Sequence, residues 1–218
     1  MPAFRGFPPE SLDFLRELEA NNDRDWFKAN RERYDEHLVA PARALGEDLA
    51  DLGQMHLFRP WNDTRFHQRP PIKEQLGLAI GYGGAGGYYV ELSLDGFLVA
   101  AGLHQPAPDQ LDRLRRAIAG GRTAAGLTRA VKRARAAGLE LGEPALTRAP
   151  RGYPPDHPRV ELLRHRSLTV HRRHDLGAWL HNPRAAKVIR EELEAAAPLV
   201  RWLREHVGPS QRGASRSG

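Results

Sequence analysis

Helical spacing of apolar residues dominates the first quarter of the chain. Ser11 can cap a helix whose leucines recur through residues 12–18. A second pattern of aromatic and apolar residues spans residues 26–38, and leucines at helical spacing return over residues 45–52. Pro41, which lies between these two segments, ends or kinks the earlier helix or starts the later one in its first turn. The N-terminal region is therefore predicted to be helical.

The middle of the chain has the composition of strands. Residues 88–94 are rich in tyrosine, valine and leucine and alternate in part between apolar and polar positions. Asp95 and Gly96 are a strong signal for a two-residue hairpin turn, and residues 97–102 supply the partner strand. A further strand is predicted over residues 167–171. These segments indicate a small, mainly antiparallel sheet.

Helical patterns return in the second half of the chain. Residues 109–120 and 123–137 predict two helices, each of which ends at glycine. Residues 176–180 predict a short helix. The last pattern, over residues 185–207, predicts a long helix that Pro198 kinks or divides.

The predicted elements place the protein in the α+β class, with a small, mainly antiparallel sheet packed with N- and C-terminal helices. We expect residues 1–207 to form a single domain, because the sequence contains no repeat and no clean boundary. Residues 208–218 are low in complexity and lack apolar anchors, so they are expected to form a disordered tail.

The charge of the chain has two interpretations. The net charge is +6, and arginine outnumbers lysine 29 to 4 among the 33 basic residues. A basic protein can bind a polyanion, and the helices over residues 111–135 with the tail would then supply a nucleic-acid surface. The same excess of arginine is also expected from the coding bias of a GC-rich genome. Nucleic acid is therefore the less favoured partner.

The absence of cysteine excludes whole classes of chemistry. A chain of 218 residues without cysteine has no disulfide, no catalytic thiolate and no cysteine-ligated metal. The N-terminus lacks the apolar run of a signal peptide, and no segment reaches the length that a membrane helix needs. We expect a cytoplasmic protein with no membrane association. Its oligomeric state is left open.

Familiar catalytic and cofactor motifs are missing or lie in the wrong context. Residues 81–86 match G-x-G-x-x-G, but they precede a predicted strand and open no helix, so a flexible loop is favoured over a phosphate-binding turn. The ten histidines include no H-E-x-x-H pair, and no G-x-S-x-G is present. The sequence predicts neither a cofactor nor a metal site.

The most informative segment is a polar loop over residues 58–75. It contains Asp63, Arg65, Arg69 and Lys73, and Pro70 and Pro71 keep it out of regular structure. The three cations could hold a phosphate or carboxylate group, while the acid could orient Arg65 through a charge-assisted hydrogen bond. The alternative is a network of salt bridges that anchors an irregular loop.

A second polar loop, over residues 148–158, has the same character. Arg151, Asp156 and His157 are held by Pro154, Pro155 and Pro158. His157 beside a carboxylate could transfer protons near neutral pH. The alternative is a turn in which Asp156 bonds its own backbone.

The two loops together suggest a function. The leading hypothesis is binding, and turnover if the protein is an enzyme, of a small phosphate- or carboxylate-bearing ligand in a pocket lined by both loops. Arg65, Lys73, Arg69 and Arg151 would bind the anion, and His157 and Asp63 are the weak catalytic candidates. The alternatives are a nucleic-acid-associated basic protein and a protein-interaction module without catalysis. The sequence leaves open whether the protein is an enzyme.

Separated segments of the chain resemble a bacterial and fungal family called domain of unknown function 2461. The resemblance rests on Asn21–Asn30 with Tyr34, on Asp63–Phe66, and on the segment from Arg151 to Pro158. It covers residues 4–205 and assigns no catalytic residue, because the family name carries no activity. This chain departs from the family pattern at Asn62, where arginine is usual, and at Ile72, where tyrosine is usual.

Overall fold

The computed structural model describes residues 3–63 and 69–211, which divide into two compact units. Unit 1 comprises Met1–Ile80, Tyr89–Val99 and Arg173–Arg190. Unit 2 comprises Gly81–Tyr88, Ala100–Arg172 and Glu191–Gly218. Each unit thus combines segments that are distant in the sequence. The expectation of one domain over residues 1–207 stays a prediction.

Six described strands hydrogen bond in the order β1-β2-β3-β4-β6-β5 and form an antiparallel sheet. The α+β class and the mainly antiparallel sheet are therefore confirmed. Met55 pairs with Ile80 where β1 meets β2, and Glu140 pairs with His171 where β5 meets β6. The strands are β1 (Met55–Leu57), β2 (Gln75–Ile80), β3 (Gly87–Ser93), β4 (Gly96–Leu103), β5 (Glu140–Leu141) and β6 (Leu168–His174).

The expected β3–β4 hairpin and the β6 strand are confirmed, whereas β1, β2 and β5 were not predicted. The five residues from Leu76 to Ile80 are all buried, so β2 shows no alternation of apolar and polar positions. β1 and β5 contain three and two residues, too few for a pattern. The expected helix at 176–180 is wrong, because that segment is a turn in which the Leu180 amide donates to the Gly177 carbonyl.

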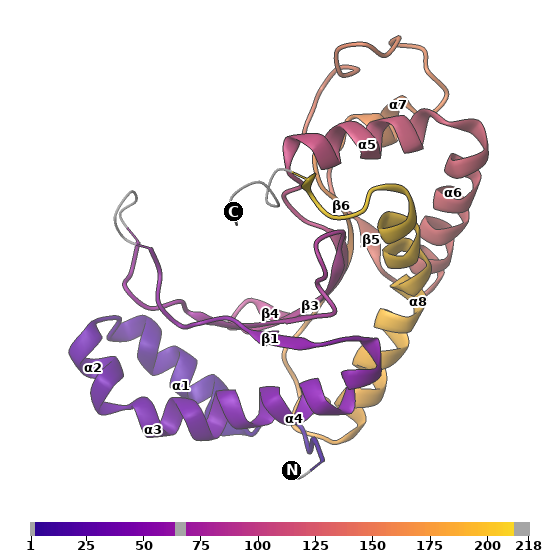
Figure 1. Ribbon diagram of the computed structural model, residues 1–218. Helices are drawn as coiled ribbons and strands as arrows, with labels where there is room; N and C mark the ends of the chain where they lie inside the picture. The colour runs from indigo at the N-terminus through magenta and orange to yellow at the C-terminus, as the bar shows by residue number, and fades with distance from the viewer. Residues whose placement is uncertain (1–2, 64–68, 212–218) are drawn as a thin grey trace. The chain divides into compact units, whose positions relative to one another are not determined.

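The helices of unit 1 lie along one side of its strands (Figure 1). Asp23 caps α2, since its carboxylate accepts hydrogen bonds from the amides of Asp25 and Trp26 at 2.9 and 2.8 Å. This cap explains the break in the pattern after α1. The elements are α1 (Pro9–Ala20), α2 (Arg24–Ala29), α3 (Arg31–Tyr34), η1 (Asp35–Val39), α4 (Ala40–Asp48) and η2 (Ala50–Leu52).

Pro41 lies inside an unbroken helical run, where a π-helical turn, η1, precedes α4. Proline has no N–H to donate to the carbonyl four residues earlier, which belongs to His37. That carbonyl instead accepts the hydroxyl of Ser11 at 2.5 Å. Ser11 is completely buried and is not the cap of α1, because Pro8 occupies that position. The predicted capping role of Ser11 is therefore replaced by a tertiary hydrogen bond.

Aromatic side chains form the centre of unit 1. The rings of Phe27 and Tyr34 are 5.1 Å apart, and Phe14 lies 5.7 Å from Tyr34. Trp26 packs against Phe14 at 5.5 Å but is only half-buried. Burial raises the pKa of Tyr34 to about 12, so its hydroxyl stays neutral. These contacts explain why the aromatic pattern before Pro41 folds into one helical layer.

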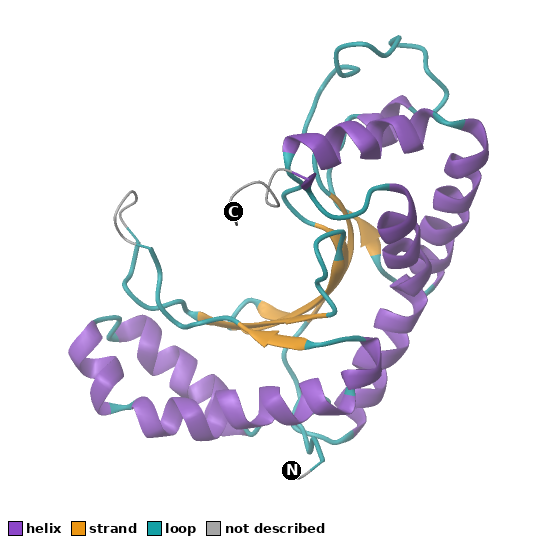
Figure 2. Ribbon diagram, viewed as in Figure 1, coloured by secondary structure: helices purple, strands orange, loops and turns teal. Residues whose placement is uncertain are grey.

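The helices of unit 2 match the predicted segments. Helix α5 packs against α6 and α7, and α6 packs against β5 (Figure 2). The long C-terminal helix is not divided at Pro198, which lies inside it. The helices are α5 (Pro108–Ala119), α6 (Gly121–Ala136), α7 (Val160–Leu163) and α8 (Arg184–His206), of which α8 begins in unit 1 and continues in unit 2.

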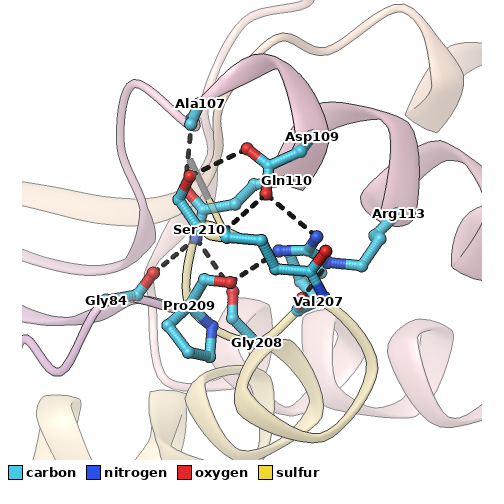
Figure 3. Close-up of polar contacts among 10 residues, drawn as sticks. Gly84, Ala107, Asp109, Gln110, Arg113, Val207, Gly208, Pro209 and Ser210 are labelled. Carbon is cyan, nitrogen blue, oxygen red and sulfur yellow. Dashed lines mark hydrogen bonds and ion pairs between the residues drawn. The ribbon is translucent and has the colours of Figure 1, made fainter. Parts of the chain in front are cut away.

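The residues after α8 bind to the start of α5, as Figure 3 shows. The Asp109 carboxylate accepts hydrogen bonds from the Ser210 hydroxyl at 2.8 Å and from the Gln211 amide at 2.9 Å. Arg113 donates to the carbonyls of Val207 and Pro209. Four residues assigned to the expected tail, 208–211, thus make or flank specific contacts. Residues 212–218 lie outside the described residues.

Side chains of α5 and α8 also hold the glycine-rich loop that joins β2 to β3. The Gln110 side chain donates to the carbonyls of Gly84 and Gly208. Arg204 donates to the Gly81 carbonyl at 2.6 Å. The loop therefore packs within unit 2 as a connection between strands, in line with the interpretation of its G-x-G-x-x-G match.

Candidate functional site

The first polar loop begins and ends as a two-stranded extension of the β1–β2 hairpin. The Phe58 amide donates to the Gly77 carbonyl at 3.0 Å. Further along, Trp61 pairs with Ile72 in an antiparallel bridge, and the Asn62 amide continues the pairing. The described part of this segment is thus more regular than its prolines predict. It belongs entirely to unit 1.

Asn22, in the turn between α1 and α2, anchors this extension. Its side-chain carbonyl accepts the Ile72 amide at 3.0 Å, and its side-chain amide donates to the Ile72 carbonyl at the same distance. The amide also donates to the Glu74 carboxylate at 2.7 Å. One asparagine therefore satisfies both backbone groups of a fully buried residue.

Lys73 contacts the backbone of the opposite arm. Its ammonium Nζ donates to the Arg59 carbonyl at 2.9 Å and lies 5.7 Å from the centre of the Phe58 ring. Burial, with the Arg59 charge as a second cause, lowers the pKa of Lys73. The ammonium thus fixes the positions of Phe58 and Arg59. Its direct binding of an anion stays a prediction.

Of the other predicted residues of this loop, Asp63 precedes and Arg69 follows residues 64–68, which the structure does not describe. Both Asp63 and Arg69 are exposed. Arg65 lies outside the described residues, and so does the predicted interaction between Asp63 and Arg65. The roles assigned to these three residues stay predictions.

The second polar loop lies in unit 2 and consists of successive tight turns. The Tyr153 amide donates to the Pro150 carbonyl at 3.2 Å, which closes a four-residue turn. Gly152 occupies the third position with φ of +90°, a conformation that suits glycine. Arg151 consequently sits at the exposed corner of the turn.

His157 and Arg159 anchor the far end of this loop. The ring Nδ1 of His157 accepts the Arg159 amide at 3.1 Å, which leaves the proton of the neutral ring on Nε2. The Arg159 guanidinium donates to the carbonyls of Ile118 and Ala119 at 2.7 and 2.6 Å, at the C-terminal end of α5. Both residues thus have structural roles. Proton transfer by His157 stays a prediction.

A hollow of about 370 Å³ lies beside this loop, within unit 2. Four arginines line it. The other lining residues carry no carboxylate; they are Leu146, Thr147, Ala149 and Pro150. The arginines come from three parts of the chain: Arg115 from α5, Arg148 and Arg151 from the loop, and Arg166 from the connection between α7 and β6.

Backbone contacts hold the wall of this hollow in place. The Leu146 amide donates to the Arg164 carbonyl at 3.1 Å, and Arg164 Nε donates back to the Leu146 carbonyl at 2.6 Å. A salt bridge of 2.9 Å to Glu161 fixes the same guanidinium. Pro150 is buried. The segment that carries Arg148 and Arg151 is therefore fixed to α7 at its start.

The electrostatics of the hollow favour an anion. Nε of Arg115 is buried and has no hydrogen-bond partner among the described residues. Over the same residues, none of the four arginines that line the hollow forms an ion pair with a carboxylate. A buried donor without an acceptor destabilises the protein, and neighbouring positive charges repel. A bound oxyanion would relieve the repulsion between the guanidinium groups.

His165, next to Arg166, was overlooked in the sequence. It is almost fully buried, and its Nδ1 has no partner in the part of the chain that the structure describes. Burial lowers the pKa of His165, although the charges of Glu143 and Glu161 act in the opposite direction. The ring is therefore neutral at physiological pH. No local pattern in the sequence marks it.

The structure brings together only part of the predicted site. Arg151 lines the hollow together with arginines that the sequence did not assign to it. Lys73, Asp63 and Arg69 belong to unit 1, whereas Arg151 and His157 belong to unit 2. A pocket shared by both loops thus stays a prediction. The sequence contained one signal for Arg115. It lies next to Leu114 and three residues before Ile118, which are buried positions of an amphipathic helix.

The described residues, 3–63 and 69–211, contain neither a metal-binding cluster nor a membrane-spanning helix. No group of three or more His, Cys, Asp and Glu side chains there could hold a metal ion. No described helix is both long and apolar enough to cross a membrane.

The family model described as Conserved hypothetical protein (DUF2461) matches residues 10–202. The chain belongs to this family. The match includes both polar loops and all four arginines of the hollow, and it confirms the resemblance seen in the sequence. The family description names no reaction and therefore adds no catalytic residue. No curated protein and no solved structure matches the chain significantly.

Proposed function

We propose that the protein binds a small oxyanion with more than one negative charge in the hollow lined by Arg115, Arg148, Arg151 and Arg166. A phosphate ester or a polycarboxylate has this chemistry. One observation carries the proposal: four arginines line one hollow, and among the described residues none of them forms an ion pair with a carboxylate. Arginine is suited to such ligands because its planar fork binds two oxygens at once.

The size of the hollow agrees with a small ligand. About 370 Å³ lies near the lower limit of typical small-molecule sites, which begin at about 300 Å³. The cationic walls select for charge rather than for apolar surface. The fixed backbone between Leu146 and Arg164 reduces the entropy lost when a ligand binds.

The proposal concerns binding and not turnover. Among the described residues that line the hollow, none has a side chain that titrates near neutral pH. Thr147 supplies a hydroxyl, and the arginines remain charged. This lining can hold and orient an anion, but general acid–base catalysis would require a group from outside it.

Helix α6 supports nucleic-acid binding as a second candidate. No residue of this helix is acidic, and its basic side chains are exposed while alanines and leucine face the core. Such a surface would bind phosphates through many diffuse contacts. The exposed basic residues of the helix are Arg122, Arg129, Lys132, Arg133 and Arg135.

Calorimetric titrations with pyrophosphate, with citrate and with random-sequence nucleic acid distinguish the two candidates. We expect Arg115→Ala and Arg151→Ala each to weaken binding of the preferred small anion by about 1.5–3 kcal/mol, the range of a hydrogen bond to a charged group. The matched control is Arg122→Ala, which removes an exposed charge from α6 and should leave the affinity unchanged.

Salt supplies a second criterion. Binding to a few converging arginines should weaken modestly as salt increases, whereas nucleic-acid binding through α6 should fall steeply. Tight nucleic-acid binding that survives Arg115→Ala, without binding of either small anion, would overturn the proposal. Equal losses from Arg115→Ala and Arg122→Ala would also contradict it, because they would indicate a general charge effect.

A further inference from the structure

A second concavity, unrelated to the arginine hollow, lies within unit 1. It is a groove of about 710 Å³ between the helical run from Arg31 to Ala44 and the segment Leu57–Trp61. Its volume falls within the range of sites for drug-sized ligands. The groove plays no part in the oxyanion binding proposed above, and the chemistry of its lining differs from that of the arginine hollow.

Aromatic and apolar side chains form much of this lining. Phe58 and Trp61 line the groove and are 39% and 37% exposed, although large hydrophobic residues are usually covered. Tyr34 adds the edge of a buried ring, and Val39 adds an aliphatic surface. Exposed rings beside a concavity are suited to stacking on a planar ligand.

Two of the three arginines in the groove carry uncompensated charge. Nε of Arg31 donates to the Asp35 carboxylate at 2.9 Å, and its guanidinium lies 5.7 Å from the Tyr34 ring centre. Among the described residues, neither Arg43 nor Arg59 forms an ion pair with a carboxylate. The groove therefore has a net positive charge in addition to its aromatic surface.

Two structural features set the geometry of this groove. The π-helical turn η1 contributes Asp35 and Val39 to one wall, and π-turns occur frequently at functional sites. On the other wall, the Lys73 ammonium holds the Arg59 carbonyl and lies over Phe58. Lys73 is therefore a positioning residue for the groove rather than part of its lining.

We infer that this groove binds a small molecule that joins a planar aromatic ring to a phosphate group, as a mononucleotide does. The ring would stack on Phe58 and Trp61, and the phosphate would bind to Arg43 and Arg59. The combination follows from the lining: a simple oxyanion would leave the exposed rings unused, and an uncharged aromatic would leave both guanidinium groups without an anion.

The test uses adenosine 5′-monophosphate as the probe, with adenosine and inorganic phosphate as its two halves. Tryptophan fluorescence reports the groove directly, because Trp61 lines it. We expect the intact nucleotide to quench the emission and to bind at least about tenfold more tightly than either half. Trp61→Phe should remove the quenching, while calorimetry still detects binding.

Substitutions locate the phosphate. Arg43→Ala and Arg59→Ala should each weaken nucleotide binding by roughly 10- to 100-fold, the loss expected for a hydrogen bond to a charged group. Arg24→Ala is the matched control, because Arg24 is exposed on α2 and does not line the groove. Arg115→Ala should leave the fluorescence titration unchanged, so failure here is distinguishable from failure of the oxyanion proposal for unit 2.

Three results would overturn the inference. Quenching by phosphate alone at the same concentration as the nucleotide would show that the rings play no part. An unchanged affinity in both Arg43→Ala and Arg59→Ala would exclude the groove. Binding of a thymidine oligonucleotide that far exceeds binding of the mononucleotide would identify a single-stranded nucleic acid as the ligand instead.

Discussion

The hydrogen bond between Ser11 and the His37 carbonyl provides a quantitative test of the helical layer in unit 1. Ser11 is completely buried, and its hydroxyl lies 2.5 Å from a carbonyl that Pro41 cannot satisfy. Ser11→Ala removes the hydroxyl and leaves the part-buried His37 carbonyl without this donor. The expected loss of unfolding free energy is about 1–3 kcal/mol, the cost of an unsatisfied buried polar group. The change in volume is small, so the cavity term is minor.

A double-mutant cycle separates this effect from general loss of packing. Pro41→Ala restores an N–H four residues after His37, so the helix can supply its own donor. In the Pro41→Ala background, Ser11→Ala should therefore cost about 1 kcal/mol less than in the natural sequence. The coupling arises because both substitutions act on one carbonyl oxygen.

Equilibrium unfolding in urea, followed by circular dichroism, measures all four variants of this cycle. Thr128→Ala is the control, since Thr128 is exposed on α6 and its hydroxyl, which donates to the Ala124 carbonyl, should contribute little. An equal cost of Ser11→Ala in both backgrounds would refute the reasoning. So would a cost no larger than that of the control.

Three further predictions concern stability. Trp26→Ala should lower the free energy of unfolding by about 3 kcal/mol, the lower end for a core aromatic, because the ring packs on Phe14 but is half-buried. Urea unfolding measures this loss, and an unchanged stability would contradict the packing. Truncation after Val207 should lower the melting temperature by several degrees because it removes Ser210 and Gln211, two of the hydrogen-bond donors to Asp109, whereas truncation after Gln211 keeps every contact described here. The Gln211 amide in particular, with the Ser210 hydroxyl, lowers the pKa of Asp109 from 3.8 to about 2. A lowered pKa stabilises the fold above pH 3.8 and loses this effect as the pH falls towards 2, so Asp109→Asn should flatten that part of the acid unfolding curve.

Local signals explain which elements the sequence predicts. The β3–β4 hairpin follows from Asp95 and Gly96, whose turn chemistry acts over a few residues. Strand β2 was missed because an unbroken apolar run has no period that separates a strand from a buried helix. The role of Ser11 was misassigned for a different reason. Its partner is 26 residues away, and a serine after prolines is also a normal cap.

The candidate site depends on contacts that no local pattern contains. Arg151 was predicted because prolines hold it in a rigid loop. Arg115, Arg148 and Arg166 come from a helix, a loop and a connection, so only the tertiary fold brings them to one hollow. The unsatisfied Nε of Arg115 is a property of packing and is invisible in the sequence. Lys73 was singled out as an anion-binding candidate, but its backbone contact could not be foreseen, because Arg59 lies 14 residues away.

The central claim is that a small oxyanion binds beside Arg115, and NMR of the arginine Nε–Hε groups tests it most directly. The Arg115 resonance is identified by its loss in Arg115→Lys. On titration with pyrophosphate or citrate, this resonance should shift further than the resonances of arginines outside the hollow, because the anion binds to the same guanidinium group. The exposed Arg122 on α6 should barely respond. An unchanged Arg115 resonance at saturating concentrations of both anions would contradict the account.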